Sequence, residues 1–406
     1  MTLDKRPVRS IVNAVAETAA AWNDRDFPPR VRAFAAVRER TGYSEPVVGF
    51  AFDRLFGALT SPAIESSIAG ELGSLDALDD FVAMTGRPPS RALPIGRICI
   101  LSSRTTIGVA VVPAIFALCA KCPVLVKDRE DALVAAFFQT LAPRLGGGGN
   151  EAVARAWDGP GDNAEFDGFA AVVAFGDDAT IATIRRALLG ETRLIAFGSK
   201  ASCGYIGRAA LSDVASAQCV AAGAAADLVL YDTEGCLSLH ALFVERGGGV
   251  EPHAFAALLA RAVERAAVEF PLGSRDALAA ARTAGARDLA AFRSAAGAGV
   301  AFADRDAGYL VLLDPPRDEP PPFLPRALAV FSVDSPEEAA AYVARHRIPI
   351  EAVAIAGSRP EIRAMAVRAG AARVAPFGRL QTPTLGGFHG GRPRIAEFVR
   401  WIADET

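Results

Sequence analysis

Cysteine and histidine are scarce in this sequence, with six and four copies among 406 residues. The cysteines are irregularly spaced, which excludes a disulfide framework, and the scattered histidines do not form a metal-binding motif. Cys119 and Cys122 make one CxxC motif, but no second pair completes a zinc site, so packing at an apolar strand-helix junction is the favoured interpretation. We therefore predict individual reduced thiols and no metal site.

Long apolar runs and a large net charge are absent too. Hydrophobic residues make up 51% of the chain, but no continuous run is long enough to span a bilayer. The charged opening MTLDKRPVRS lacks the apolar region of a secretory signal, so we expect a cytoplasmic protein without a membrane span. The 43 Lys and Arg residues nearly balance the 46 Asp and Glu residues, so we expect no nucleic acid partner.

The usual nucleotide-binding and hydrolase motifs are missing as well. No GxGxxG opens a helix after a strand, and neither GxxxxGK[ST] nor GxSxG occurs. A cofactor would therefore have to bind in another way.

The distribution of short apolar runs predicts an α/β fold with two domains, because 406 residues are too many for one ordinary core. From Asp4 to Ala92, apolar positions recur three and four residues apart between prolines, which favours helices and loops. From Ile95, strand-like runs such as RICIL and AAVVAF alternate with alanine-rich helical runs, as in a parallel, doubly wound sheet. The last residues, FVRWIADE, are expected to form a helix.

Cys236 is the cysteine whose neighbours favour chemistry. It lies in DTEGCLSLH, where Gly235 permits a sharp turn after a helix and Ser238 leaves room beside the sulfur. Cys99 and Cys219 lie within apolar runs, which is typical of packing. An exposed thiol in a turn can ionise and attack a carbonyl carbon, so the residues leave two interpretations open, a nucleophile or a structural cysteine.

Several segments resemble one known family in order and spacing. AAADLVLYDTEGCLSLH resembles the cysteine motif of the fatty acyl-CoA reductases of bacterial bioluminescence, the LuxC type within the aldehyde dehydrogenase superfamily. GRICILSSRTTIGVAVVPAIFALCAKCPVLVKDRED and RLIAFGSKAS resemble superfamily segments, and RVAPFGRLQTPTLGGFHGGRPRIAEFVRW is similar to the family's C-terminal signature. The resemblance covers the chain from about Ile95 to its end, and the cysteine and tail motifs are the specific ones.

The resemblance implies an aldehyde-dehydrogenase-like fold in which two domains, each with a doubly wound and mostly parallel sheet, flank a cleft. Residues 1–94 would form a helical lead-in that is part of the cofactor domain, and residues 95–197 would bind the nicotinamide cofactor. Residues 198–375 would form the catalytic domain that carries Cys236, and residues 376–406 would return to the cleft.

The resemblance also implies roles for individual residues. Cys236 would accept the acyl group. Lys127 would hold the adenosine ribose or its 2′-phosphate, Glu130 would contact the ribose hydroxyls, and Gly176 would let the cofactor approach closely. Luminescence reductases use NADPH, whereas Glu130 is typical of relatives that prefer NAD, so the cofactor is NADPH or NADH. For Lys127 and Glu130, a solvated strand end is the alternative.

Two departures from the superfamily pattern bear on the reaction. The glutamate that activates water in hydrolytic aldehyde dehydrogenases is replaced by Ala196, which favours a reductase because the acyl-enzyme would hydrolyse slowly. The loop after RICIL lacks the asparagine that stabilises the oxyanion, so the backbone N–H of Cys236 and a serine or threonine hydroxyl of this loop, such as that of Ser103, would have to replace it. His240 would poise the thiol or donate a proton, with a strand residue pointing elsewhere as the alternative.

Together these features predict the reduction of a fatty acyl thioester, carried by CoA or an acyl-carrier protein, to the aldehyde with NAD(P)H through a Cys236 acyl-enzyme. An enzyme similar to glutamyl-phosphate reductase, acting on an acyl phosphate, is one alternative. The other is a catalytically weak subunit that binds an acyltransferase or synthetase partner, and the missing asparagine favours it. The sequence leaves the oligomeric state open.

Overall fold

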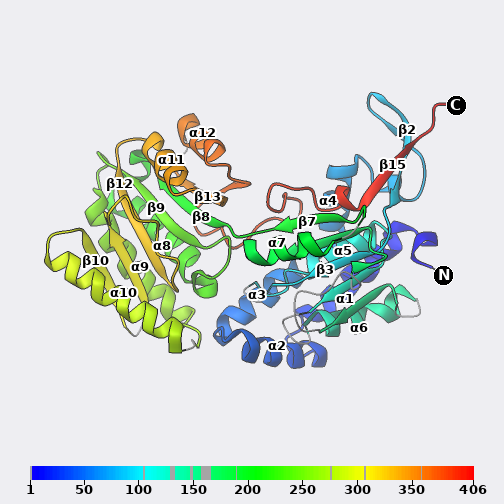
Figure 1. Cartoon of the computed structure of the whole chain (residues 1–406), viewed down its shortest axis with the longest axis horizontal. Coiled ribbons are helices and arrows are strands. Elements are labelled where there is room, and N and C mark those ends of the chain that lie inside the picture. Colours follow the sequence, from blue (N-terminus) through cyan, green and yellow to red (C-terminus); the bar gives the residue numbers. More distant parts are fainter. Residues whose placement is uncertain are drawn as a thin grey trace. The chain divides into compact units, whose positions relative to one another are not determined.

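The chain folds into two compact units. The computed structural model describes residues 2–103, 106–128, 133–146, 150–156, 166–188, 190–274, 277–305, 308–357 and 359–406 (Figure 1). Unit 1 consists of Met1–Thr41, Val48–Ser199 and Thr384–Thr406, and unit 2 consists of Gly42–Val47 and Lys200–Pro383. The last residues of the chain therefore return to the unit that its first residues form.

Unit 1 is built on a five-stranded parallel sheet with the order β5-β4-β3-β6-β7. Its strands are β3 (Ile98–Leu101), β4 (Val124–Lys127), β5 (Ala152–Arg155), β6 (Ala171–Phe175) and β7 (Arg193–Phe197). Its crossover helices are α5 (Val111–Cys119), α6 (Leu133–Leu145) and α7 (Asp178–Ala187). The winding direction reverses between β3 and β6, so the sheet is doubly wound, and ligands in such folds bind outside the carboxyl ends of these two strands.

Four helices precede the sheet and supply much of the core of unit 1. They are α1 (Val8–Asn23), α2 (Pro28–Thr41), α3 (Glu45–Gly57) and α4 (Ser61–Leu72). The indole of Trp22 is fully buried, with its ring 4.8 Å from that of Phe56 and 5.9 Å from that of Phe137 on α6. Its Nε1 donates a 2.9 Å hydrogen bond to Thr140, so the buried N–H is satisfied. The helical lead-in is therefore confirmed as far as α4.

Residues 82–94 differ from the expected helices and loops, because they form a β-hairpin. Its strands are β1 (Val82–Met84) and β2 (Arg87–Pro94). Two of the three prolines in β2, Pro88 and Pro89, argued against a strand, since proline has no N–H to donate. Here both prolines act as acceptors. The carbonyl oxygen of Pro88 accepts a hydrogen bond from the Ser90 hydroxyl, and that of Pro89 accepts one from the N–H of Asp404, so these bonds need no N–H from proline.

The C-terminus is a strand and not the expected helix. Strand β15 (Val399–Ala403) pairs antiparallel with β2 and completes a three-stranded sheet, and Figure 1 shows it in red beside β2. Its partner lies far away in the sequence, so the local pattern of FVRWIADE could not reveal the pairing. Trp401 and Ile402 remain partly exposed on this strand.

Unit 2 contains a seven-stranded sheet with the order β10-β11-β12-β9-β8-β13-β14, in which only β10 and β11 are antiparallel. The strands are β8 (Ala201–Ile206), β9 (Leu239–Glu245), β10 (Val300–Asp304), β11 (Tyr309–Leu313), β12 (Ala327–Val333), β13 (Ile350–Ala356) and β14 (Arg373–Ala375). The helices are α8 (Val214–Val229), α9 (Pro252–Glu269), α10 (Ala277–Ala295), α11 (Pro336–Arg345) and α12 (Pro360–Arg368). Side chains of α8 and α9 share one core with the sheet, and those of α11 and α12 share a second. The predicted fold of two doubly wound, mostly parallel sheets is confirmed.

Helix α8 is apolar enough to raise the question of a membrane. With the short turn that follows it, it is the one helix in the described parts of the chain that could cross a bilayer by length and composition, and α3 and α4 pass the same test only as a bent pair. Its buried face includes Ala221, Ala225 and Leu228, which pack in the core of unit 2. The core helices of water-soluble domains have this same character.

Candidate active site

Cys236 lies in a turn at the amino end of β9, in the middle of the unit 2 sheet. The residue is half-buried. The hydroxyl of Ser202 on the neighbouring strand β8 donates a 2.8 Å hydrogen bond to the carbonyl oxygen of Cys236. The same oxygen of Ser202 accepts a 3.2 Å hydrogen bond from the N–H of Ala352 on β13. The turn that carries the thiol is thus fixed to two strands of the sheet.

The other five thiols occupy different surroundings. Cys99, Cys119, Cys122 and Cys203 are buried, as packing cysteines are. Cys219 is exposed on α8, so the expectation that it packs in an apolar run is wrong. The run AQCVAAG is apolar, but residue 219 lies on the outer side of the helix.

The segment before Cys236 has an unusual backbone. Tyr231, Asp232 and Thr233 have φ angles of 56°, 50° and 63°, in the left-handed region that side chains other than glycine seldom adopt. Such residues cost about 1–3 kcal/mol each and persist only where their surroundings hold them. Tyr231 and Asp232 lie inside the short 3-10 helix η5 (Leu230–Thr233), which ends the α8 region.

A buried ion pair holds this left-handed segment. The Nε of Arg326 donates a 2.8 Å hydrogen bond to Oδ1 of Asp232, and both side chains are fully buried. The backbone N–H of Arg326 donates to the hydroxyl of Thr233 at 3.0 Å, and that hydroxyl donates to the carbonyl oxygen of Leu228 at 2.9 Å. Residues just before β12 therefore fix the path of the chain into the Cys236 turn.

The Cys236 thiol is less ready to ionise than its sequence suggested. Burial and the carboxylate of Glu351 raise its pKa to about 12, while Lys200 and the backbone N–H groups of Cys236 and Leu237 act in the opposite direction. The sequence suggested an exposed thiol, but Cys236 is half-buried, and this burial is what opposes ionisation. At neutral pH the sulfur is protonated, and its reactivity must rise with pH.

His240 is buried on β9, where the ladder with β8 is irregular. Leu239 pairs with Ser202 and Ala241 with Cys203, so His240 is an extra residue in the strand. Its ring lies 5.0 Å from that of Phe323, and its Nδ1 has no hydrogen-bond partner among the described residues. Burial lowers its pKa to about 4, so the imidazole is neutral at neutral pH and offers no positive charge to a thiolate.

Lys200 and Glu351 are two residues of this region that sequence reasoning missed. Nζ of Lys200 lies 2.9 Å from a carboxylate oxygen of Glu351, whose side chain is 8% exposed. The signal was present, because Glu351 is the one charged residue in the apolar run IPIEAVAIAG. A carboxylate in a buried strand requires a partner or a function. The partner, Lys200, lies just before another strand, β8, and could not be identified locally.

Three of the predicted residues lie at one edge of the unit 1 sheet. Ser103 follows β3, Lys127 ends β4 and Gly176 follows β6, and these are neighbouring strands in the order β4-β3-β6. The N–H of Ser102 donates to the carbonyl oxygen of Lys127 at 3.2 Å, and Lys127 is 3% exposed. Glu130 lies outside the described residues.

These residues fit a dinucleotide in part. The crevice between β3 and β6 is where this fold class binds one, and Lys127, which is almost fully buried, ends the neighbouring strand β4. A side chain at Gly176 would begin 3.1 Å from Thr180, so packing against α7 is one reason for its glycine. The carboxylate of Asp177 caps α7 through the N–H of Thr180 at 2.7 Å, so the start of that helix is no phosphate site.

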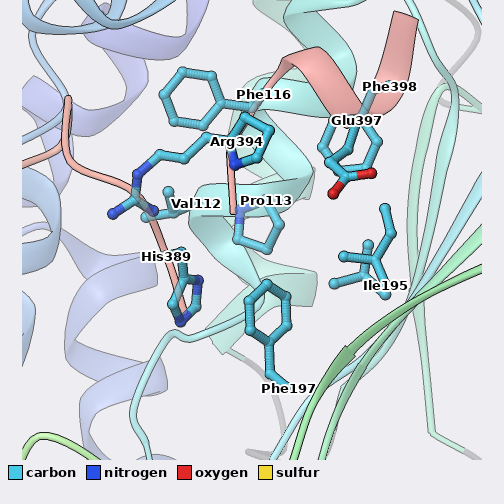
Figure 2. Close-up of a pocket in the computed structure, with 11 residues that line it drawn as sticks. Val112, Pro113, Phe116, Ile195, Phe197, His389, Arg394, Glu397 and Phe398 are labelled. Carbon is cyan, nitrogen blue, oxygen red and sulfur yellow. The ribbon is translucent and has the colours of Figure 1, made fainter. Parts of the chain in front are cut away.

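A small cavity lies on the α5 side of the unit 1 sheet, covered by the returning C-terminal residues (Figure 2). Apolar side chains of α5, β6 and β7 form most of its wall. Figure 2 shows His389 beside Phe197, and the two rings are stacked with their centroids 4.4 Å apart. The free volume is about 20 Å³, which holds about one water molecule, so the cavity as it stands has no room for an acyl chain.

The sequence matches the model of one protein family, acyl-CoA reductase (LuxC), over residues 3–401. A comparison with curated protein sequences finds no match.

Solved structures of similar fold include several dehydrogenases. A NAD-dependent benzaldehyde dehydrogenase from Corynebacterium glutamicum is 14% identical, with a TM-score of 0.71 over 100% of this chain and 87% of that one. A glyceraldehyde-3-phosphate dehydrogenase from Methanocaldococcus jannaschii, complexed with NADP, is 10% identical, with a TM-score of 0.72 over 99% and 90% of the two chains. Aldehyde dehydrogenase 21 from Physcomitrella patens, in complex with succinate, is 10% identical, with a TM-score of 0.72 over 98% and 86%. These likenesses show an aldehyde-dehydrogenase-like fold.

Proposed function

Because the chain belongs to the acyl-CoA reductase (LuxC) family, we propose that it reduces a fatty acyl thioester to the aldehyde with NADPH or NADH, through an acyl-enzyme on Cys236. The observation that carries this proposal is the setting of Cys236. It is the half-buried thiol in a turn that Ser202 fixes and that two charged side chains face. Four other cysteines are buried, and Cys219 lies on the outside of a helix.

In the first step the sulfur of Cys236 bonds to the thioester carbonyl carbon. The thiol proton is released, and the carrier sulfur leaves and takes up a proton, so one thioester replaces another at little cost in free energy. The backbone N–H of Cys236 is one donor to the developing oxyanion, and the Ser103 hydroxyl remains the proposed second donor. Binding therefore serves mainly to position and ionise one sulfur atom.

In the second step the acyl-enzyme is reduced, and the resulting thiohemiacetal collapses to aldehyde and free Cys236. A nicotinamide dinucleotide, when bound, supplies the hydride. Lys127 and Gly176 are the residues we assign to holding it. The Asp128 carboxylate accepts hydrogen bonds from the N–H groups of Val134 and Ala135 at the start of α6, which disperses its negative charge. Asp128 follows Lys127, and its carboxylate would repel a 2′-phosphate less strongly because of these bonds, so the proposal includes NADPH as well as NADH.

The position of Ala196 supports a reductase over a hydrolase. It lies on β7, and its methyl group cannot take a proton from water. An acyl group on Cys236 therefore persists until hydride or a thiol reaches it.

Mass spectrometry of the intact protein tests the proposal. Wild-type protein is exposed to myristoyl-CoA without cofactor, and we expect one acyl adduct. Cys236→Ser should form none, whereas Cys219→Ser, which removes an exposed thiol, should behave like the wild type. An adduct that survives in Cys236→Ser, or none in the wild type, counts against the proposal.

The missing asparagine after β3, together with the raised pKa of the Cys236 thiol, favours a second candidate, the weakly active subunit that depends on a partner. The two candidates differ in the purified chain alone. Oxidation of NADPH or NADH by this chain with myristoyl-CoA excludes the second, and the same assay with an acyl phosphate tests the glutamyl-phosphate-reductase alternative.

A further inference from the structure

Strands β13 and β9 each have a β-bulge, with one extra residue, where they pair with β8 near Cys236. On β13, Ile350 pairs with Ala201 and Ala352 with Ser202, so Glu351 is the extra residue of this strand. The matching irregularity on β9 falls at His240. Such bulges redirect a side chain and are frequent beside active sites.

The bulge at Glu351 is tied to the nucleophile through Ser202. The hydroxyl of Ser202 bonds both to the N–H of Ala352, the next residue on β13, and to the carbonyl oxygen of Cys236. The carbonyl oxygen of Glu351 also accepts a 3.0 Å hydrogen bond from Ala372 before β14. The backbone of Glu351 is therefore held from both sides.

Lys200 brings the opposite charge to the same place. It precedes β8, and its ammonium lies 2.9 Å from the Glu351 carboxylate, with 26% of the lysine side chain exposed. Both groups interact electrostatically with the Cys236 sulfur. Further out, Arg373 of β14 faces Glu351 and also faces Asp227 of α8.

We propose that Lys200 and Glu351 are positioning residues that set the pH above which Cys236 can accept an acyl group. The carboxylate, redirected by the bulge, opposes a negative charge on the sulfur, and the ammonium favours it. Because the two charges are paired, their opposite effects on the Cys236 sulfur partly cancel. Removal of one charge leaves the effect of the other on the sulfur uncompensated. The inference rests on the proposed function only in taking Cys236 as the acyl acceptor.

The test measures the pH dependence of Cys236 alkylation by iodoacetamide, followed by peptide mass spectrometry. Glu351→Gln should move the profile to lower pH and raise the rate at a fixed neutral pH by about tenfold. Lys200→Gln should move it to higher pH and lower that rate by a similar factor. Glu337→Gln removes the partner of Arg368 on the surface of unit 2 and should leave the profile unchanged.

The double variant Lys200→Gln/Glu351→Gln buries no lone charge, and its profile should fall between those of the single variants. It keeps the test decisive if one single variant fails to fold. Shifts of Glu351→Gln and Lys200→Gln in the same direction, or a double variant outside the range of the single ones, would overturn the inference. Alkylation needs no acyl donor, so this result is independent of whether Cys236 forms an acyl-enzyme.

Discussion

The hydroxyl of Ser202 lies 2.8 Å from the carbonyl oxygen of Cys236 and donates a hydrogen bond to it. Because the same hydroxyl accepts from the N–H of Ala352, one side chain connects the thiol-bearing turn with β8 and β13. This contact holds the backbone of Cys236 in place. The pKa of its sulfur is set by burial and by the nearby charges of Glu351 and Lys200.

Replacement of Ser202 by alanine should loosen the Cys236 turn. A buried N–H and a carbonyl group lose their partner, which costs about 1–3 kcal/mol of unfolding free energy. Urea unfolding measures this loss, and acylation by myristoyl-CoA should slow in parallel. Ser10→Ala removes an exposed hydroxyl that bonds only to Pro7, so it should change neither quantity. Equal stability of Ser202→Ala and wild type would contradict the role given to this contact.

Arg326→Met should destabilise unit 2 strongly. It leaves the fully buried carboxylate of Asp232 without its ion-pair partner, and breaking a buried pair costs about 3–5 kcal/mol. Adding Asp232→Asn removes the lone charge, so the double variant should recover part of the loss. Denaturant unfolding of the three proteins checks this order. A double variant that is less stable than Arg326→Met would show that the charge is not the cause.

Asp227 should make stability depend on pH. Burial raises its pKa to about 7, against the opposing effect of the N–H groups of Gly378 and Leu380. The unfolded chain has a pKa of about 3.9, so between these values the folded state binds more protons. The Asp227 contribution to the unfolding free energy therefore falls as pH rises from about 4 to about 7, and is constant above. Asp227→Asn should remove that slope, and an unchanged slope would exclude Asp227 as its source.

Glu71→Ala should release the chain before β15. The Glu71 carboxylate accepts hydrogen bonds from three successive N–H groups, those of Arg394, Ile395 and Ala396. Loss of these three hydrogen bonds should lower the free energy of unfolding by about 3 kcal/mol and accelerate hydrogen exchange at these amides. Glu65→Ala, on the same helix, breaks only an exposed pair with Arg9 and should leave exchange unchanged. Protection that persists in Glu71→Ala would show that other contacts hold this segment.

The parts of the fold that follow local patterns could be predicted from the sequence. Buried strands such as RICIL and AAVVAF are short β-rich runs between helices, and the structure places them at the centre of the unit 1 sheet. The helical lead-in was predictable for the same reason. The antiparallel sheet of β2 and β15 was not, because proline obscures one strand and the other is defined only by its distant partner.

The candidate site shows the same division. Cys236 could be singled out by its glycine-bounded turn and by the motif around it. The left-handed conformation of Asp232 could not be predicted, because its ion-pair partner, Arg326, lies 94 residues further along the chain. The link between Glu351 and Lys200 likewise depends on β13 pairing with β8 across a long crossover.

A single-turnover experiment tests the central claim most directly. Protein carrying one acyl group on Cys236 is freed of myristoyl-CoA and mixed with NADPH or NADH. We predict that the adduct disappears as aldehyde forms in equal amount, with little free acid, because Ala196 cannot activate water. An adduct that persists with both cofactors, or that yields fatty acid instead of aldehyde, would contradict the account.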